Sequence, residues 1–248
     1  MEFQRLHPDP GPVDSAELLG DLRLGERAHD GRPWTIANFA TTADGRATID
    51  GRSGPIGDDG DLELFRRLRT QVDALLVGTR TLGVERYGRA VRRPELRAVR
   101  EALGLAPEPL VVTVSRSGEL PLEIPLFEEP DARVVAFVPR DAPQPACAAN
   151  LTLVRLDLAE LTLTSALRHL SAEHGVRSLL CEGGPTLMGA LLHERLVDEL
   201  FLTLAPQLAG GGAGPTLTSG PPLPEPAALE LAWALERAGS LYLRYAVR

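Results

Sequence analysis

The stretch that decides the fold is residues 179–188, LLCEGGPTLM, in which an apolar run ends in an acid, two glycines and a proline. This order predicts a buried strand that enters a helix through a tight turn, because proline has no amide hydrogen and fits the first position of a helix. The glycines lack a Cβ and let a ligand approach the backbone. The helix start offers unpaired amide hydrogens to a phosphate. Taken alone, the pattern fits a bare turn equally well, so the rest of the chain decides its meaning.

Strand and helix patterns alternate on both sides of this turn, which predicts an α/β fold with a mainly parallel central sheet flanked by helices. Two final strand patterns, residues 229–237 and 241–247, read as an antiparallel pair and make the sheet mixed. The other strands are expected at residues 33–40, 73–78, 109–114, 133–138, 151–156, 178–181 and 198–205. The helices are expected at 79–84, 94–103, 164–174 with Gly175 as its stop, and 186–196.

One further helix is expected after a long loop. The loop, residues 41–57, is rich in glycine, aspartate and serine, and its length exceeds that of most connections, which indicates a function. Asp58 or Asp59 can cap the helix that follows. Its apolar face is predicted to be Leu62, Phe65 and Leu68.

The length and composition indicate one main domain. The chain has 248 residues, of which 44% are hydrophobic, and this is enough for one sizeable core or two small ones. No composition shift divides it, so residues 32–248 are predicted to form a single domain. Residues 1–31 carry several prolines and a short amphipathic stretch at 16–24. They are expected to form an arm that either packs on the body or is partly mobile.

Several classes of protein are disfavoured. The net charge is −8 with no basic patch, which argues against nucleic acid as a partner. No apolar run is long enough to cross a bilayer, and the first residues lack an apolar signal core, so a cytoplasmic location is expected. Cys147 and Cys181 belong to no paired motif and are expected to stay reduced. The zinc-deaminase pattern is missing, and His169 and His174 are interpreted as helix-surface residues that do not share a face.

Polar residues follow four of the predicted strands. They are Asn38 with the loop to Ser53, residues 78–81 (GTRT), residues 115–116 (SR) and residues 182–184 (EGG). Because the carboxyl ends of parallel strands meet at one edge of a sheet, these four segments are expected to converge on one crevice. Taken alone, residues 78–81 fit a capped helix start, and residues 115–116 fit a turn. Together they indicate a nucleotide with phosphates held at two points, although the Gly-x-Gly-x-x-Gly and Walker patterns are absent.

A family resemblance emerges from these motifs. Residues 78–81 and 114–117 resemble the NADPH-binding turns of dihydrofolate reductases. Asn38 with residues 42–46 (TADGR), residues 69–81 and residues 181–187 together resemble the reductase domain of riboflavin biosynthesis. The segments LVDEL at 196–200 and, at 205–211, AP followed by GG also fit. The resemblance runs from Pro33 to Arg248, and the chain with its arm is similar to stand-alone members of that family.

The resemblance implies a dihydrofolate-reductase-like fold, a homodimer, and NADPH-dependent reduction of a 5-amino-6-(5-phosphoribosylamino)uracil-type substrate to its ribitylamino product. Matched by position, Asn38 would lie beneath the reacting ribose, and Asp44 would shape the site or assist proton delivery, unless it only forms an Asx turn. Ser53, Arg69 and Glu182 would contact the phosphorylated pyrimidine, and Glu182 would also act in catalysis. The residues expected at the cofactor, from the match and from the motifs above, are Thr41, Gly78, Arg80, Thr81, Glu85, Ser115, Arg116, Gly183, Gly184, Pro185, Thr186, Leu187 and Met188.

The chain also departs from the family pattern. Pro55 stands where many members have tryptophan, and Glu85 is followed by arginine where they have an acid pair. The arginine-rich residues 86–93 align poorly, and Arg89, Arg92 and Arg93 all stay open as the group that holds the substrate phosphate.

Two alternatives therefore remain. One is another NADPH reductase on the same scaffold, acting on a pterin or dihydrofolate, with Asp61 or Glu63 as the buried carboxylate that such a ring needs. The other is a non-catalytic nucleotide-binding regulatory protein. No Ser-His-Asp grouping is evident, and this favours hydride transfer over hydrolysis.

Overall fold

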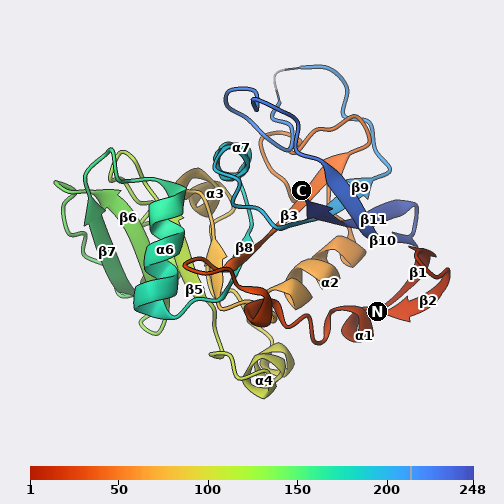
Figure 1. Cartoon of the computed structure of the whole chain (residues 1–248), viewed down its shortest axis with the longest axis horizontal. Helices are drawn as coiled ribbons and strands as arrows, with labels where there is room; N and C mark the ends of the chain where they lie inside the picture. Colours follow the sequence, from red (N-terminus) through yellow and green to blue (C-terminus); the bar gives the residue numbers. More distant parts are fainter. Residues whose placement is uncertain (213) are drawn as a thin grey trace.

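The computed structural model describes residues 1–212 and 214–248. Among these residues one sheet of eleven strands runs through the molecule in the order β2-β1-β10-β11-β9-β3-β8-β4-β5-β6-β7 (Figure 1). The strands are β1 Glu2–His7, β2 Gly11–Asp14, β3 Trp34–Thr42, β4 Ala74–Leu76, β5 Leu110–Val114, β6 Arg133–Pro139, β7 Asn150–Leu156, β8 Ser178–Cys181, β9 Glu199–Ala205, β10 Leu229–Arg237 and β11 Ser240–Val247. The helices are α1 Ser15–Leu19, a 3-10 turn Leu24–Arg27, α2 Asp59–Leu68, α3 Thr79–Val84, α4 Pro94–Ala102, α5 Pro125–Glu128, α6 Leu163–His174 and α7 Pro185–His193.

The sheet is mixed and mainly parallel, as predicted. Strands β9, β3, β8, β4, β5, β6 and β7 run parallel to one another, and β11, β10, β1 and β2 continue the sheet in antiparallel fashion. The element patterns around residues 179–188 are confirmed: β8 enters α7, which starts with Pro185 at its first turn. Gly175 ends α6 in the left-handed conformation, with φ of 63°.

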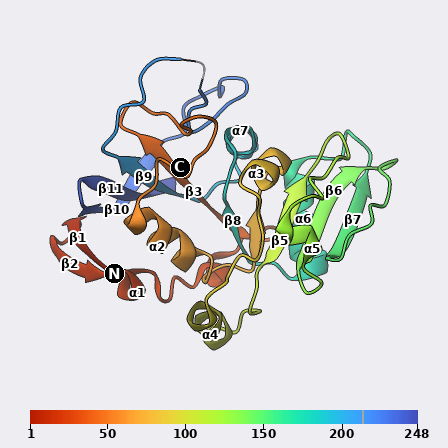
Figure 2. The same cartoon turned by 180° about the vertical axis from the view of Figure 1, so that it is seen from behind.

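Helices cover both faces of the sheet (Figures 1 and 2). Successive residues of a strand point to opposite faces, so Leu75 and Leu76 of β4 enter different clusters. Leu75 packs in the cluster that holds Leu68 of α2, whereas Leu76 packs with Leu170 of α6. The central strands are therefore apolar on both sides, as a parallel sheet between two helical layers requires.

The N-terminal arm packs on the body. β1 pairs with β10 and β2 pairs with β1, so both strands extend the main sheet. Phe3 is 2% exposed and stacks edge-on against Tyr242 of β11. The amphipathic stretch at 16–24 is not one helix, because α1 ends at Leu19 and a separate 3-10 turn begins at Leu24. Both leucines are nevertheless buried, so the predicted apolar residues do anchor the arm.

Two predictions about helix faces were wrong. In α2, Asp58 caps the helix as expected, but Leu62 is 40% exposed and the buried side chains are Leu64 and Leu68. Leu62 lines a cleft instead of the core. In α6, the rings of His169 and His174 lie 5.6 Å apart, so they do share a face. Burial, with the nearby His169, lowers the pKa of His174.

None of the helices in the described part of the chain has the length and apolar character that a membrane span needs. Within the same residues, no cluster brings together three or more histidine, cysteine, aspartate or glutamate side chains that could hold a metal ion.

Candidate active site

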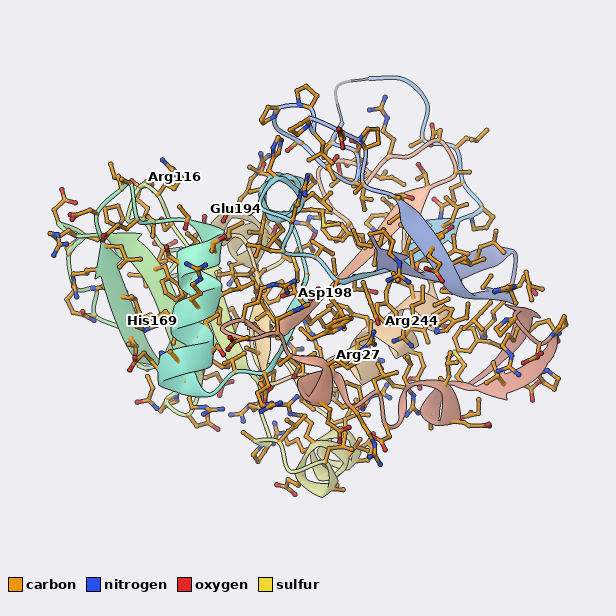
Figure 3. The ribbon with its side chains drawn as sticks, viewed as in Figure 1. Arg27, Arg116, His169, Glu194, Asp198 and Arg244 are labelled. Carbon is orange, nitrogen blue, oxygen red and sulfur yellow. The ribbon has the colours of Figure 1, made fainter. Side chains whose placement is uncertain are left out.

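A cleft of about 1570 Å³ opens at the carboxyl ends of β3, β8, β4 and β5. Figure 3 labels Arg116, just beyond β5, and Glu194, just beyond α7, and both line this cleft. Most residues predicted for the site meet here, although they come from segments far apart in the sequence. Those that line the cleft are Asn38, Ser53, Arg69, Gly78, Arg80, Thr81, Glu85, Arg116, Glu182, Gly183, Gly184, Pro185, Thr186 and Leu187.

Three glycines bring two of the predicted turns into contact. The amide of Gly78 donates to the carbonyl of Gly183 at 2.8 Å. A Cβ on Gly184 would lie 2.9 Å from the hydroxyl of Thr81, and a Cβ on Gly78 would lie 3.4 Å from the Gly184 amide nitrogen. Gly183 has φ of 96°, a conformation that glycine alone adopts easily. The two turns thus form one smooth backbone surface in the cleft.

The start of α7 opens onto that surface. Its N-cap is Gly184, which supplies no side-chain hydrogen bond to the first turn. The first amide groups of the helix therefore remain available to a ligand, and the helix dipole favours an anion there. A dinucleotide phosphate has the matching charge and acceptor oxygens.

Glu182 is held in a buried ion pair at the base of the cleft. Its carboxylate accepts from Nε and Nη2 of Arg69 at 2.7 and 2.8 Å, and from the hydroxyl of Tyr87 at 2.8 Å. The side chain of Glu182 is 1% exposed and that of Arg69 is 13% exposed. Burial opposes the charge on Arg69, but the adjacent Glu182 carboxylate raises its pKa. Burial and the same carboxylate raise the pKa of Tyr87, so its phenol stays protonated.

This triad joins two predicted residues and one that the sequence analysis missed. Arg69 and Glu182 lie together as predicted, yet they bind each other. Tyr87 belongs to the poorly aligned segment 86–93, and no sequence pattern marks it. Arg100 is also new: its buried guanidinium donates to the carbonyls of Arg69 and Val72 and so supports the loop that carries Arg69. Burial lowers the pKa of Arg100 to about 10.

The long loop after β3 reaches the cleft through Ser53. The backbone amide and hydroxyl of Ser53 donate to Glu85 at 3.2 and 2.9 Å. Glu85 follows the end of α3, so this contact joins a predicted substrate residue to a predicted cofactor residue. Asn38 lies on β3 at the floor of the same cleft.

Four predicted residues do not line the cleft. Thr41 and Met188 are 5% and 1% exposed and pack in the interior. The Ser115 hydroxyl turns inward and donates to the carbonyl of Glu119 at 2.8 Å, which leaves Arg116 as the cleft residue of that pair.

Asp44, the fourth, fastens two loops together. Its carboxylate accepts from the Thr42 hydroxyl and from the amides of Ala209 and Gly210. These hydrogen bonds, that from Thr42 above all, lower the pKa of Asp44 to about 2. At neutral pH the group is ionised and has no proton to deliver.

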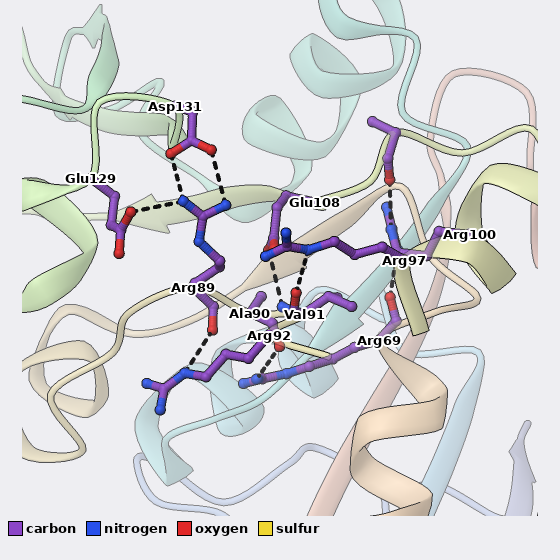
Figure 4. A network of polar contacts seen from close by, with 11 residues as sticks. Arg69, Arg89, Ala90, Val91, Arg92, Arg97, Arg100, Glu108, Glu129 and Asp131 are labelled. Atoms are coloured by element: carbon purple, nitrogen blue, oxygen red, sulfur yellow. Dashed lines mark hydrogen bonds and ion pairs between the residues drawn. The ribbon is translucent and has the colours of Figure 1, made fainter. Parts of the chain in front are cut away.

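The arginines of segment 86–93 differ in their partners (Figure 4). Arg89 donates to Glu129 at 2.8 Å and to both carboxylate oxygens of Asp131 at 2.9 and 2.8 Å. Arg92 makes one long bond, 3.4 Å, to the carbonyl of Arg89. Among the described residues, Arg92 and Arg93 form no ion pair, and both are exposed and line the cleft.

Comparisons with known proteins identify relatives of this chain. The family model described as RibD C-terminal domain matches residues 33–241. A protein of Archaeoglobus fulgidus named 2,5-diamino-6-ribosylamino-4(3H)-pyrimidinone 5′-phosphate reductase is 32% identical over 195 residues, which are 76% of this chain and 87% of that protein. A Methanothermobacter thermautotrophicus protein with the same name is 30% identical, over 88% of this chain and 99% of its own length.

Solved structures share the fold. A pyrimidine reductase-like protein of Corynebacterium diphtheriae superposes with a TM-score of 0.76 at 24% identity, over 95% of this chain and 99% of its own. A Thermotoga maritima deaminase/reductase has a TM-score of 0.68 at 22% identity, and the match covers 88% of this chain and 58% of that one.

Proposed function

The chain belongs to the RibD C-terminal domain family, and from this membership we propose that it is an NADPH-dependent reductase of riboflavin biosynthesis. Its substrate is a ribosylaminopyrimidine 5′-phosphate of the 5-amino-6-(5-phosphoribosylamino)uracil type, and the product is the ribitylamino compound. The observation that carries the proposal is the single cleft in which the glycine turns, the open start of α7 and the Arg69–Glu182–Tyr87 triad meet. The names of the Archaeoglobus fulgidus and Methanothermobacter thermautotrophicus relatives support the reduction of a ribosylaminopyrimidine 5′-phosphate.

The glycine surface fits the dinucleotide. A Cβ at Gly184 would lie 2.9 Å from the Thr81 hydroxyl. Because Gly184 has no side chain, a flat ligand can lie directly against the backbone there. We assign the phosphates to the start of α7, with Arg80 and Arg116 as the exposed cationic groups at the cleft. When bound, the cofactor supplies the hydride. The chain's own task is to hold the reacting carbon close to the donor and to keep water away.

The pyrimidine is assigned to the other part of the cleft. Arg69 and Glu182 act on it as one hydrogen-bonded unit, in which the covered Glu182 carboxylate orients the Arg69 guanidinium. Ser53 contributes from the long loop, and Asn38 lies below the ribose. A planar guanidinium fixed by a bidentate carboxylate is a rigid donor for ring carbonyl groups.

An assay of NADPH oxidation tests the proposal directly. The purified protein is mixed with NADPH and either the uracil substrate or the 2,5-diaminopyrimidinone substrate named for the relatives. We expect NADPH consumption matched by a product that is two hydrogens heavier by mass spectrometry. Turnover of dihydrofolate instead would favour the pterin alternative. If the protein binds NADPH but does not oxidise it with either pyrimidine or with dihydrofolate, the regulatory alternative is favoured.

Cofactor choice gives a prediction at Arg116. Arg116 is exposed at the cleft and, within the described part of the chain, forms no ion pair, so we propose that it binds the 2′-phosphate of NADPH. A charge-assisted hydrogen bond of about 1.5–3 kcal/mol corresponds to roughly 10–100-fold in affinity. Arg116→Ala should therefore raise the KM for NADPH by about that factor and leave the KM for NADH unchanged. Arg140→Ala is the control, because Arg140 pairs with Asp157 at the surface.

The substrate phosphate gives a second prediction, at the arginine-rich segment. We propose that Arg92 and Arg93 bind it, because Arg89 is already neutralised by Glu129 and Asp131. Arg92→Ala and Arg93→Ala should each raise the pyrimidine KM by about 10-fold or more, with little change in the KM for NADPH. Arg89→Ala should leave the pyrimidine KM nearly unchanged. A larger effect at Arg89 than at the other two would contradict the assignment.

Three further features of the protein are proposed, the homodimer from the family and the other two from the sequence. They are a homodimer, a cytoplasmic location, and a single reductase domain over residues 32–248 with residues 1–31 as its arm. Sedimentation equilibrium of the purified protein checks the first. Because β1 and β2 belong to the main sheet, deletion of residues 1–31 should also expose the edge of β10 and lower solubility.

A further inference from the structure

The proposed reduction needs a proton as well as a hydride. In the open-chain imine form of the substrate, the hydride adds to C1′ while the C=N π bond breaks toward nitrogen. The nitrogen then takes a proton, so one C–H and one N–H bond form, and NADPH is oxidised as the imine is reduced. Some group in the cleft has to supply that proton.

Three of the carboxyl groups already discussed are unsuited to this role. Asp44 is ionised by its hydrogen bonds and lies outside the cleft. Glu182 is paired with Arg69, and Glu63 with Arg67 at 2.6 Å on the side of α2 that meets the arm. Burial opposes the charge on Glu63, but hydrogen bonding from Arg67 lowers its pKa. The Glu182 oxygens are already occupied by Arg69 and Tyr87.

Asp61 differs from them in its surroundings. It stands in the first turn of α2, and its side chain lines the cleft. The hydroxyl of Thr203 donates to its Oδ1 at 2.6 Å. Among the described residues, Asp61 forms no ion pair, and burial is the chief influence that raises its pKa.

The charged and titratable groups around Asp61 also favour the protonated form. Its like-charged neighbour is Asp58, the N-cap of the same helix, whose charge raises the pKa of Asp61 further. Asp58 itself accepts from the hydroxyls of Ser240 and Tyr242 of β11, and burial with this hydrogen bonding raises the pKa of the Tyr242 phenol. From β9 comes only the neutral Thr203 hydroxyl. No cation reaches Asp61 from β9 or β11.

The register of the sheet places Thr203, the partner of Asp61, near Asn38, the residue assigned to the ribose. Thr203 of β9 pairs with Ala40 of β3, and Asn38 lies two residues earlier on β3. Residues two apart on a strand share a face and are separated by about 7 Å. Asn38 and Ala40 both line the cleft. The carboxyl held by Thr203 is therefore next to the floor position assigned to the ribose.

We propose that Asp61 is the proton donor of the reduction, which delivers the proton from its carboxyl group to the imine nitrogen directly or through one water. The resulting carboxylate regains a proton from solvent. This role rests on the proposed function.

The test compares the wild type with Asp61→Asn, in which the amide keeps the size and the Thr203 contact of the carboxyl. We expect kcat to fall about 100-fold or more, in the range typical of a lost general acid, with the KM for NADPH unchanged. The wild-type kcat should decline as the pH rises through the raised pKa of Asp61, and this decline should be absent in Asp61→Asn. Asp59→Asn removes the same charge from the same turn of α2 and should keep both kcat and its pH profile.

A second variant separates this role from a structural one. The Thr203 hydroxyl stabilises the Asp61 carboxylate, so Thr203→Val should move the decline of kcat to higher pH without abolishing it. Wild-type turnover together with an unchanged kcat profile in Asp61→Asn would overturn this role and leave the proposed function intact. Absence of wild-type turnover with either pyrimidine would overturn both.

Discussion

An Arg69→Met variant is expected to lose about 3–5 kcal/mol of unfolding free energy, the usual cost of leaving a buried carboxylate without its cation. The Glu182 side chain is 1% exposed, so water cannot replace the guanidinium, and only the Tyr87 hydroxyl would still donate to it. Chemical denaturation measures the loss. The same variant should lose almost all turnover, because the bidentate donor that faces the pyrimidine is gone.

Variants of Glu182 and Tyr87 show whether Arg69 and Glu182 act as one unit. Glu182→Gln should keep the fold but cut turnover strongly, since one of its two side-chain positions becomes an amide that cannot accept from Arg69. The double variant Arg69→Met/Glu182→Gln should be more stable than Arg69→Met alone, because it leaves no buried charge without a partner. Tyr87→Phe removes one hydroxyl bond and should cost only about 1–2 kcal/mol. Equal stability of Arg69→Met and the wild type would show that the ion pair is not formed in solution.

A Gly183→Ala variant is expected to weaken NADPH binding by about 10–100-fold. The residue has φ of 96°, where a side chain costs roughly 1–3 kcal/mol, and each 1.4 kcal/mol is about tenfold in affinity. A Cβ there would also lie 3.3 Å from the ring of Phe39, so the turn has to shift. The shift displaces the Gly183 carbonyl that accepts from Gly78, and both turns of the glycine surface move.

Fluorescence titration with NADPH measures this loss of affinity. Gly211→Ala is the matched control. A Cβ at that position meets no atom within 4 Å, and the backbone of Gly211 is outside the positive-φ region. It should bind NADPH as the wild type does. Unchanged affinity in Gly183→Ala would place the cofactor away from the glycine surface.

Much of the fold could be predicted because its signals are local. The strand, turn and helix at residues 178–193 follow from an apolar run, two glycines and a proline at fixed offsets. The same holds for α3 and for the stop of α6 at Gly175. The β-strands of the arm were missed because only Phe3 of β1 is buried, and a single apolar residue gives no alternation to detect.

The site was predictable in outline and not in detail. Strand ends in a parallel sheet share an edge, so the meeting of Asn38, residues 78–81, Arg116 and Glu182 follows from topology. The inward turn of Ser115 and the burial of Met188 do not, because each depends on what packs against the side chain.

The sequence by itself determined the order of elements, the parallel class of the sheet and the family, because these depend on neighbours within a few residues or on motif spacing. Tertiary structure alone decided which polar groups meet: Tyr87 and Arg69 on Glu182, Arg89 on Asp131, and Thr203 on Asp61. The Arg69–Glu182 and Thr203–Asp61 contacts join residues 113 and 142 positions apart. Their energies depend on burial and on distances of a few ångströms, quantities that exist only once the chain has folded.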